Sequence, residues 1–203
     1  MQKMDGFIDI AENMQWWDGA VKIYDDAFPE WEKEDIDHIL KNIENGRYKM
    51  VAYLSNNKVE GIYILDINHQ LDYALFSFLA VDTALRGQKI GTMLCAHAIN
   101  YFQNHVSCQW LFIEAEDRQC KFYSKFGFKK LQIKYNVPKF NSSQSIAMHL
   151  MCIDKNKRID SESLKNIIEH IFVHGYCLPE DDQRIQKQLE RIPVTIDAMA
   201  SRS

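Results

Sequence analysis

The sequence has 203 residues, of which 46% are hydrophobic and 26% charged, with a formal net charge of -4. This composition is typical of one folded catalytic domain, and the length is short for two full domains. The net negative charge excludes the broad basic surface that nucleic-acid binding requires. No stretch approaches the ~18 apolar residues of a membrane span, and the start MQKMDGFIDI lacks the apolar core of a secretory signal. We therefore expect a soluble, cytoplasmic protein that binds neither nucleic acid nor a membrane.

The cysteines are odd in number and widely spaced, a pattern that fits neither a disulfide framework nor a paired zinc site. We expect reduced, mostly packed thiols at Cys95, Cys108, Cys120, Cys152 and Cys177. His170, His174 and Cys177 have a helical spacing that could converge on a metal ion, but no fourth ligand lies nearby. We therefore predict no metal site.

The first half of the chain predicts two helices followed by three strands. Apolar residues at helical spacing predict a helix over 17–28 that Pro29 ends, and a second helix over 33–43 closes at Gly46. Two short apolar runs on either side of SNNK predict a hairpin whose asparagines adopt the left-handed turn conformation. Residues 73–81 are apolar on both faces, as in a central strand.

The second half predicts a helix over 92–104, a strand over 110–115 and a short helix over 117–126 that Gly127 ends. Strands over 128–135 and 145–153 follow, joined by a long turn. The predicted order is therefore two helices, three strands, helix, strand, helix and two strands.

From about Asp154 the sequence becomes more charged. A helix over 161–175 is predicted to begin at a capping serine, and its apolar stripe comprises Leu164, Ile167, Ile168 and Ile171. Another helix is predicted over 181–191, after which we expect the chain to fray. We thus predict one domain over 1–153 and a small helical C-terminal extension over 154–203, which either packs on the domain or serves as a lid or docking element.

The turn RGQKIGT, residues 86–92, joins a predicted strand to a predicted helix. Such a turn presents free backbone amides at the positive end of the helix dipole, which favours an anion such as a phosphate. Arg86 and Lys89 add positive charge, while Gly87 and Gly91 allow close approach. The turn matches neither a nucleotide P-loop nor the dinucleotide fingerprint. The alternative is an ordinary strand-to-helix connection with an exposed Arg and Lys.

Two segments carry a family resemblance. FLAVDTALRGQKIGTML resembles the coenzyme A pyrophosphate loop of the GNAT acetyltransferase superfamily, and FYSKFGF, residues 122–128, resembles its second signature. The resemblance covers about residues 15–153 and implies a GNAT-like α/β (α+β) fold with a mixed, strongly twisted central sheet of six to seven strands flanked by helices. Lys89 departs from the pattern, which has a glycine there, and we expect it to keep a negative φ and offer only its amide.

The resemblance also implies how acetyl-coenzyme A is bound. The backbone of Leu79–Val81 pairs with the pantetheine arm, and the amides of 87–92 hold the pyrophosphate. The implied cofactor-binding residues are Leu79, Ala80, Val81, Arg86, Gly87, Gln88, Lys89, Ile90, Gly91, Thr92 and Phe122.

The catalytic residues are implied in part. Tyr123 matches the tyrosine that protonates the coenzyme A sulfur, although it could also serve only in packing beside Phe122. Ser77 stands where many relatives carry a glutamate base. Glu114 and Glu116 are therefore the candidate bases, acting directly or through water, unless they are merely solvated charges. An amine of low enough pKa needs no base.

We therefore expect an enzyme, an acyl-coenzyme A-dependent N-acyltransferase that moves an acetyl group from acetyl-coenzyme A to a primary amine by direct attack. The acceptor is a small-molecule or peptide amine, and a homodimer is left open. The alternative is a catalytically weak or inactive coenzyme A-binding or protein-docking module with the same fold, which Ser77 and Lys89 favour.

Overall fold

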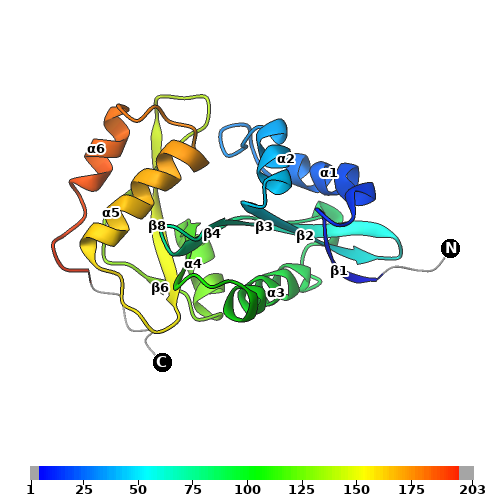
Figure 1. Ribbon diagram of the computed structural model, residues 1–203. Helices are drawn as coiled ribbons and strands as arrows, with labels where there is room; N and C mark the ends of the chain where they lie inside the picture. Colours follow the sequence, from blue (N-terminus) through cyan, green and yellow to red (C-terminus); the bar gives the residue numbers. More distant parts are fainter. Residues whose placement is uncertain (1–4, 197–203) are drawn as a thin grey trace. The chain divides into compact units, whose positions relative to one another are not determined.

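The computed structural model describes residues 5–196, and its strands and helices form an α/β fold (Figure 1). Within that range there are eight strands and six α-helices, which confirms the predicted fold class. The chain divides into two compact units. Unit 1 comprises the chain up to Ile67 together with Ala74–Val106, and unit 2 comprises Asn68–Tyr73 and the chain from Ser107 onward.

Unit 1 holds the first four strands and three helices. In chain order these elements are β1 (Gly6–Asp9), α1 (Trp17–Ala27), α2 (Ile36–Glu44), β2 (Tyr48–Ser55), β3 (Lys58–Asn68), β4 (Tyr73–Val81) and α3 (Ile90–His105). The strand order is β1-β2-β3-β4, and β2 is antiparallel to both of its neighbours. Strand β1 is not among the predicted elements; its four residues are ordered by pairing with the edge of β2, from Gly6 opposite Leu54 to Asp9 opposite Val51.

The local signals of unit 1 are largely confirmed. Asn56 and Asn57, with φ of 51° and 58°, form the hairpin turn, and Gly46 closes α2 with a φ of 78°. Helix α2 begins three residues later than predicted because the Asp35 carboxylate caps it, accepting hydrogen bonds from the amides of Asp37 and His38 at 2.9 and 3.2 Å.

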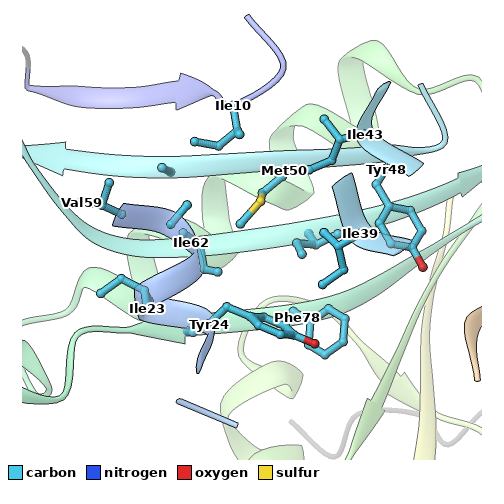
Figure 2. Close-up of a cluster of buried hydrophobic side chains, with 14 of the residues drawn as sticks. Ile10, Ile23, Tyr24, Ile39, Ile43, Tyr48, Met50, Val59, Ile62 and Phe78 are labelled. Atoms are coloured by element: carbon cyan, nitrogen blue, oxygen red, sulfur yellow. The ribbon is translucent and has the colours of Figure 1, made fainter. Parts of the chain in front are cut away.

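The core of unit 1 lies between the sheet and the helix pair α1 and α2, while α3 covers the opposite face (Figure 1). Figure 2 shows how side chains from both helices meet those of β2, β3 and β4. The labelled members of this cluster are Ile10, Ile23, Tyr24, Ile39, Ile43, Tyr48, Met50, Val59, Ile62 and Phe78. On the other face, the Tyr63 hydroxyl hydrogen-bonds His97 Nδ1 of α3 at 2.9 Å. Burial on both faces explains why these strands lack a clean polar alternation.

A glycine in β3 brings the elements of unit 1 close together. A Cβ added to Gly61 would lie 2.7 Å from Leu94 Cδ1 of α3 and 2.9 Å from the backbone oxygen of Ala80 in β4. Only a residue without a side chain therefore fits here, and it sets the packing of α3 against the strand that leads into the 86–92 turn.

Unit 2 holds the remaining elements. In chain order these are β5 (Trp110–Ala115), α4 (Asp117–Ser124), β6 (Lys129–Lys130), β7 (Tyr135–Pro138), β8 (Ser145–Asp154), α5 (Ser161–His170), a π-helical turn (Ile171–Gly175) and α6 (Gln183–Leu189). Strand β8 pairs antiparallel with β5, β6 and β7.

The single strand predicted over 128–135 is split into β6 and β7. Lys130 lies opposite Met151 and Tyr135 opposite Met148, so the chain uses more residues than its partner strand between these two pairs. The surplus residues must leave the ladder, which breaks the strand.

The C-terminal helices lie in unit 2, together with β5 to β8. The predicted apolar stripe of α5 is fully buried. Its cap is Asp160, whose carboxylate accepts from the Ser163 amide at 2.8 Å, so the predicted serine cap is wrong. Ile192 is still buried beyond α6, and the rest of the expected fraying falls in part on residues 197–203, outside the described residues. The predicted domain boundary at 153 stays a prediction.

Four of the cysteines are buried free thiols, and Cys177 is an exposed one. Among residues 5–196, no helix combines the length and apolarity needed to cross a membrane.

Candidate functional site

The turn between β4 and α3 is shaped by two left-handed residues. Asp82 caps a 3-10 turn, Thr83–Leu85, by accepting from the Ala84 amide at 2.9 Å. Gly87 then has a φ of 85° and Lys89 a φ of 65°, after which α3 begins at Ile90. The predicted cofactor residues Leu79, Ala80 and Val81 are the last three residues of β4, just before this turn.

The backbone amides at the amino end of α3 receive no capping hydrogen bond from a side chain of the described residues. The first turn of the helix carries no acidic residue. The first amide to bond within the helix is that of Met93, which donates to the Lys89 carbonyl at 3.0 Å, so the amides of Ile90, Gly91 and Thr92 have no acceptor in the helix itself. These donors lie at the positive end of the 16-residue helix dipole, and the preceding Arg86, Gly87, Gln88 and Lys89 are exposed. Backbone donors in this arrangement suit an anion.

The conformation of Lys89 differs from the expectation. We expected a negative φ, and the structure has 65°, in the left-handed region. Lys89 is the N-cap residue of α3 and directly precedes the buried Ile90, so the left-handed torsion lies where the chain enters the helix. A glycine would adopt this torsion without strain, as in the resembled loop.

The second predicted signature covers the last turn of α4 and the residues after it, all in unit 2. Tyr123 is 7% exposed and its ring meets those of Phe122 and Phe128 at centroid distances of 5.1 and 5.9 Å. The helix predicted over 117–126 ends two residues early, at Ser124, and the turn after it closes at Gly127, which has a φ of 94°. The packing contribution of Tyr123 is thus evident, and its acid role stays a prediction.

Glu116 stands at the start of α4. Its amide donates to the Gln119 side-chain oxygen at 2.8 Å, and its carboxylate accepts from Arg118 Nε at 2.7 Å. Arg118 is exposed. Glu116 therefore has a structural task at a helix terminus, and of the two candidate bases it is the one already engaged by a cation.

Glu114 lies in a different setting, on β5 between two phenols. Its two carboxylate oxygens accept hydrogen bonds from Tyr135 at 2.5 Å and from Tyr176 at 2.6 Å. Burial raises the pKa of Glu114, and the two phenols oppose that rise by favouring the ionised carboxylate. Tyr135 and Tyr176 are absent from the predicted site because they lie 21 and 62 residues from Glu114, beyond the reach of a local pattern.

Ser77, at the position of the missing glutamate, is half-buried on β4 and donates to the Leu75 carbonyl at 3.4 Å. It has no acidic group to contribute.

The histidines considered as metal ligands have other partners. His170 Nδ1 contacts the Tyr73 hydroxyl at 2.8 Å and its Nε2 contacts the Asn68 amide nitrogen at 2.9 Å, so both ring nitrogens are engaged. Within residues 5–196, no three His, Cys, Asp or Glu side chains gather in a way that could hold a metal ion.

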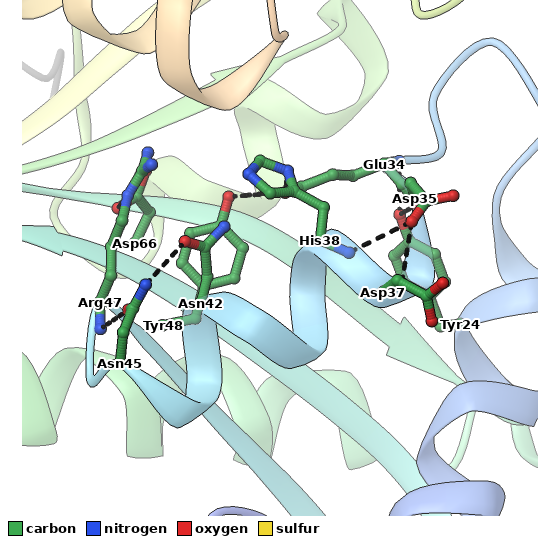
Figure 3. Close-up of polar contacts among 10 residues, drawn as sticks. All are labelled: Tyr24, Glu34, Asp35, Asp37, His38, Asn42, Asn45, Arg47, Tyr48 and Asp66. Carbon is green, nitrogen blue, oxygen red and sulfur yellow. Dashed lines mark hydrogen bonds and ion pairs between the residues drawn. The ribbon is translucent and has the colours of Figure 1, made fainter.

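A group of polar contacts around the buried Glu34 in unit 1 was not predicted (Figure 3). Glu34 is 3% exposed, lies 2.6 Å from His38 Nδ1, and accepts from the Tyr48 hydroxyl at 3.0 Å. The Tyr24 hydroxyl accepts from the Glu34 amide at 2.8 Å. Burial raises the pKa of Glu34 to about 8, despite the hydrogen bond from Tyr48 that lowers it.

Comparison with known proteins gives a family match. Residues 17–128 match the family model described as the acetyltransferase (GNAT) family. No curated protein sequence matches the chain.

Solved structures share the fold at low identity. A putative acetyltransferase of the GNAT family from Bacteroides thetaiotaomicron is 16% identical with a TM-score of 0.68, over 85% of this chain and 99% of that one. The ribosomal-protein-S18-alanine N-acetyltransferase from Escherichia coli is 18% identical with a TM-score of 0.59, over 77% and 100%. A Bacillus subtilis acetyltransferase in complex with CoA is 19% identical with a TM-score of 0.50, over 66% and 91%.

Proposed function

Because the chain belongs to the GNAT acetyltransferase family, we propose that it is an N-acyltransferase that moves an acetyl group from acetyl-coenzyme A to a primary amine by direct attack. The observation that carries this proposal is the uncapped amino end of α3 behind an exposed turn with two left-handed residues. A small-molecule or peptide amine is the proposed acceptor.

The 86–92 turn has the proposed task of binding the diphosphate of the cosubstrate. The amides from Gly87 to Thr92 donate to the phosphate oxygens, and Arg86 and Lys89 add positive charge at the same place. The backbone at the end of β4, from Leu79 to Val81, is proposed to pair with the pantetheine arm, and Phe122 to lie against the cofactor.

Two groups of unit 2 have proposed roles in proton transfer. The neutral amine attacks the thioester carbonyl carbon with its nitrogen lone pair, and Glu114 takes the proton that the nitrogen loses as the new carbon–nitrogen bond forms. The carbon–sulfur bond breaks, and Tyr123 gives its hydroxyl proton to the departing sulfur. Glu116 is the second candidate base, through water.

The second candidate function is a coenzyme A-binding module without turnover. Two observations favour it: Ser77 stands in place of an acidic group on β4, and the non-glycine residue Lys89 occupies the left-handed position of the turn.

The proposal is tested by calorimetry with acetyl-coenzyme A and by thiol release over a panel of primary amines. Tyr123→Phe is expected to lower kcat by about 100-fold or more while leaving acetyl-coenzyme A affinity unchanged, because a general acid contributes roughly 10²- to 10⁴-fold. Tyr53→Phe, a change in β2 of unit 1, is the control and should keep wild-type kcat. Binding without turnover would support the module, and absence of binding would contradict both functions.

A further inference from the structure

We propose that Tyr135 and Tyr176 are positioning residues that hold Glu114 ready to accept the proton of the amine, so that the segment after β8 completes the catalytic site. This inference rests on the proposed function. Both tyrosines lie beyond residues 17–128, the part of the chain that matches the family model. The match itself therefore assigns them no role.

The hydrogen bonds fix both oxygens of the carboxylate. Tyr135 donates to Oε1 at 2.5 Å and Tyr176 to Oε2 at 2.6 Å. Hydrogen bonds from a phenol to a carboxylate are among the stronger hydrogen bonds in proteins. With one donor on each oxygen the carboxylate plane cannot rotate freely. Each oxygen still has a second lone pair to receive a proton.

The two phenols are themselves held by aromatic packing. Phe172 contacts both, with its ring centroid 6.1 Å from Tyr135 and 5.8 Å from Tyr176. Phe140 stacks on Tyr176 at 5.1 Å and 30°. Tyr135 is 2% exposed, whereas Tyr176 is half-buried, so one phenol holds the carboxylate from the core and the other holds it from nearer the surface.

A π-helical turn precedes Tyr176 in the C-terminal segment. Helix α5 passes into the π-helical turn Ile171–Gly175, and the Tyr176 amide donates to the Ile171 carbonyl at 3.0 Å. This bond spans five residues, one more than in an α-helix, and Tyr176 directly follows the turn. Turns of this kind occur frequently at functional sites.

The phenols also decide the protonation of Glu114. Burial raises its pKa and the bonds from Tyr135 and Tyr176 lower it, and these phenols are the titratable groups that act on it. Removing one phenol leaves a buried carboxylate oxygen without its donor. The neutral acid is then favoured at a higher pH, and a neutral acid cannot take up the proton of an amine.

The test is the pH profile of kcat/KM for wild type and Tyr176→Phe. The variant should lose about tenfold or more at the acidic end and regain most of its activity at high pH, because the acidic limb moves upward by about one pH unit. Tyr101→Phe, on α3 in unit 1, is the matched control and should keep the wild-type profile. A ¹³C-carboxyl titration of Glu114 in both proteins gives the same shift without turnover.

A double variant separates positioning from packing. If Tyr176 acts through Glu114, then Tyr176→Phe should have no further effect on kcat in a Glu114→Gln background, whereas a merely structural change would lower both proteins equally. If the wild-type protein turns over and Tyr176→Phe has the same pH profile of kcat/KM and the same Glu114 titration, the positioning role alone is overturned. Failure of the wild-type protein to acetylate any amine would overturn the proposed function, and with it this role.

Discussion

At the scale of single residues, Lys89 shows how a turn can impose a conformation that its side chain disfavours. A left-handed φ costs a residue with a Cβ roughly 1–2 kcal/mol, and Lys89 adopts 65° immediately before α3. The buried Ile90, the first residue of α3, follows directly, and its burial in the core holds Lys89 in place. The same torsion orients the amides that we propose to bind the diphosphate.

We predict that Lys89→Gly raises the free energy of unfolding by roughly 0.5 kcal/mol, since relief of the left-handed strain exceeds the entropy cost of glycine. Gln88→Gly, at the exposed neighbouring position that is not left-handed, should lower it by about the same amount. Urea denaturation of both variants measures this. Equal destabilisation by the two changes would show that residue 89 is not held in the left-handed region.

At the scale of elements, α6 is joined to β7 through one buried polar side chain. Gln188 is 2% exposed. Its side-chain oxygen accepts a hydrogen bond from the backbone N–H of Asn136, and its side-chain nitrogen donates to the backbone carbonyl of Lys134, both at 3.0 Å. It thereby supplies the short strand with partners that a neighbouring strand would otherwise provide.

Gln188→Ala is expected to cost about 2 kcal/mol of stability, because it removes two part-buried hydrogen bonds that contribute roughly 1 kcal/mol each. Gln186→Ala, an exposed change in the same helix, should stay within about 0.5 kcal/mol of wild type. Chemical denaturation gives both values, and hydrogen exchange at the Asn136 amide should accelerate in the first variant alone. Similar losses of stability in Gln188→Ala and Gln186→Ala would mean that helix propensity is responsible, and not the two hydrogen bonds of Gln188.

At the scale of the whole molecule, each unit contains a carboxyl group whose pKa is raised by burial, Glu34 in unit 1 and Glu114 in unit 2. A carboxyl whose pKa is higher in the folded than in the unfolded chain binds its proton more tightly when folded. Its contribution to stability is complete below the unfolded pKa and is lost as the pH rises through the folded pKa. For Glu34 this window extends from about 4.5 to about 8.

The stability of Glu34→Gln relative to wild type is therefore predicted to increase between pH 5 and pH 8, by on the order of 2 kcal/mol. The amide cannot ionise, and it can still accept the hydrogen bond from Tyr48. Burial lowers the pKa of His38, which has the opposite effect on stability, and because His38 Nδ1 lies 2.6 Å from the Glu34 carboxylate both proteins are compared in a His38→Gln background. Urea unfolding at several pH values measures the difference, with the exposed Glu44→Gln as control. A difference that is flat with pH would show that Glu34 is ionised throughout.

Much of the fold could be read from local patterns. Apolar periodicity located α1, β4, α3 and β5, and Gly46 and the Asn56–Asn57 turn ended elements where predicted, because glycine and asparagine tolerate left-handed torsions that other residues resist. The turn at 86–92 was also recognisable, since its glycines and the helix after it are adjacent in sequence.

The sequence by itself thus determined most of the elements, several of their turns and the family, all of which depend on residues within a few positions of one another. Only the tertiary structure decided that β1 joins the edge of β2, that β6 and β7 separate, and that Glu34 is buried. It also decided that Tyr135 and Tyr176 reach Glu114. The physical reason is that a local pattern sets torsions and faces, whereas partners far apart in the chain are chosen by strand register and by the packing of the core.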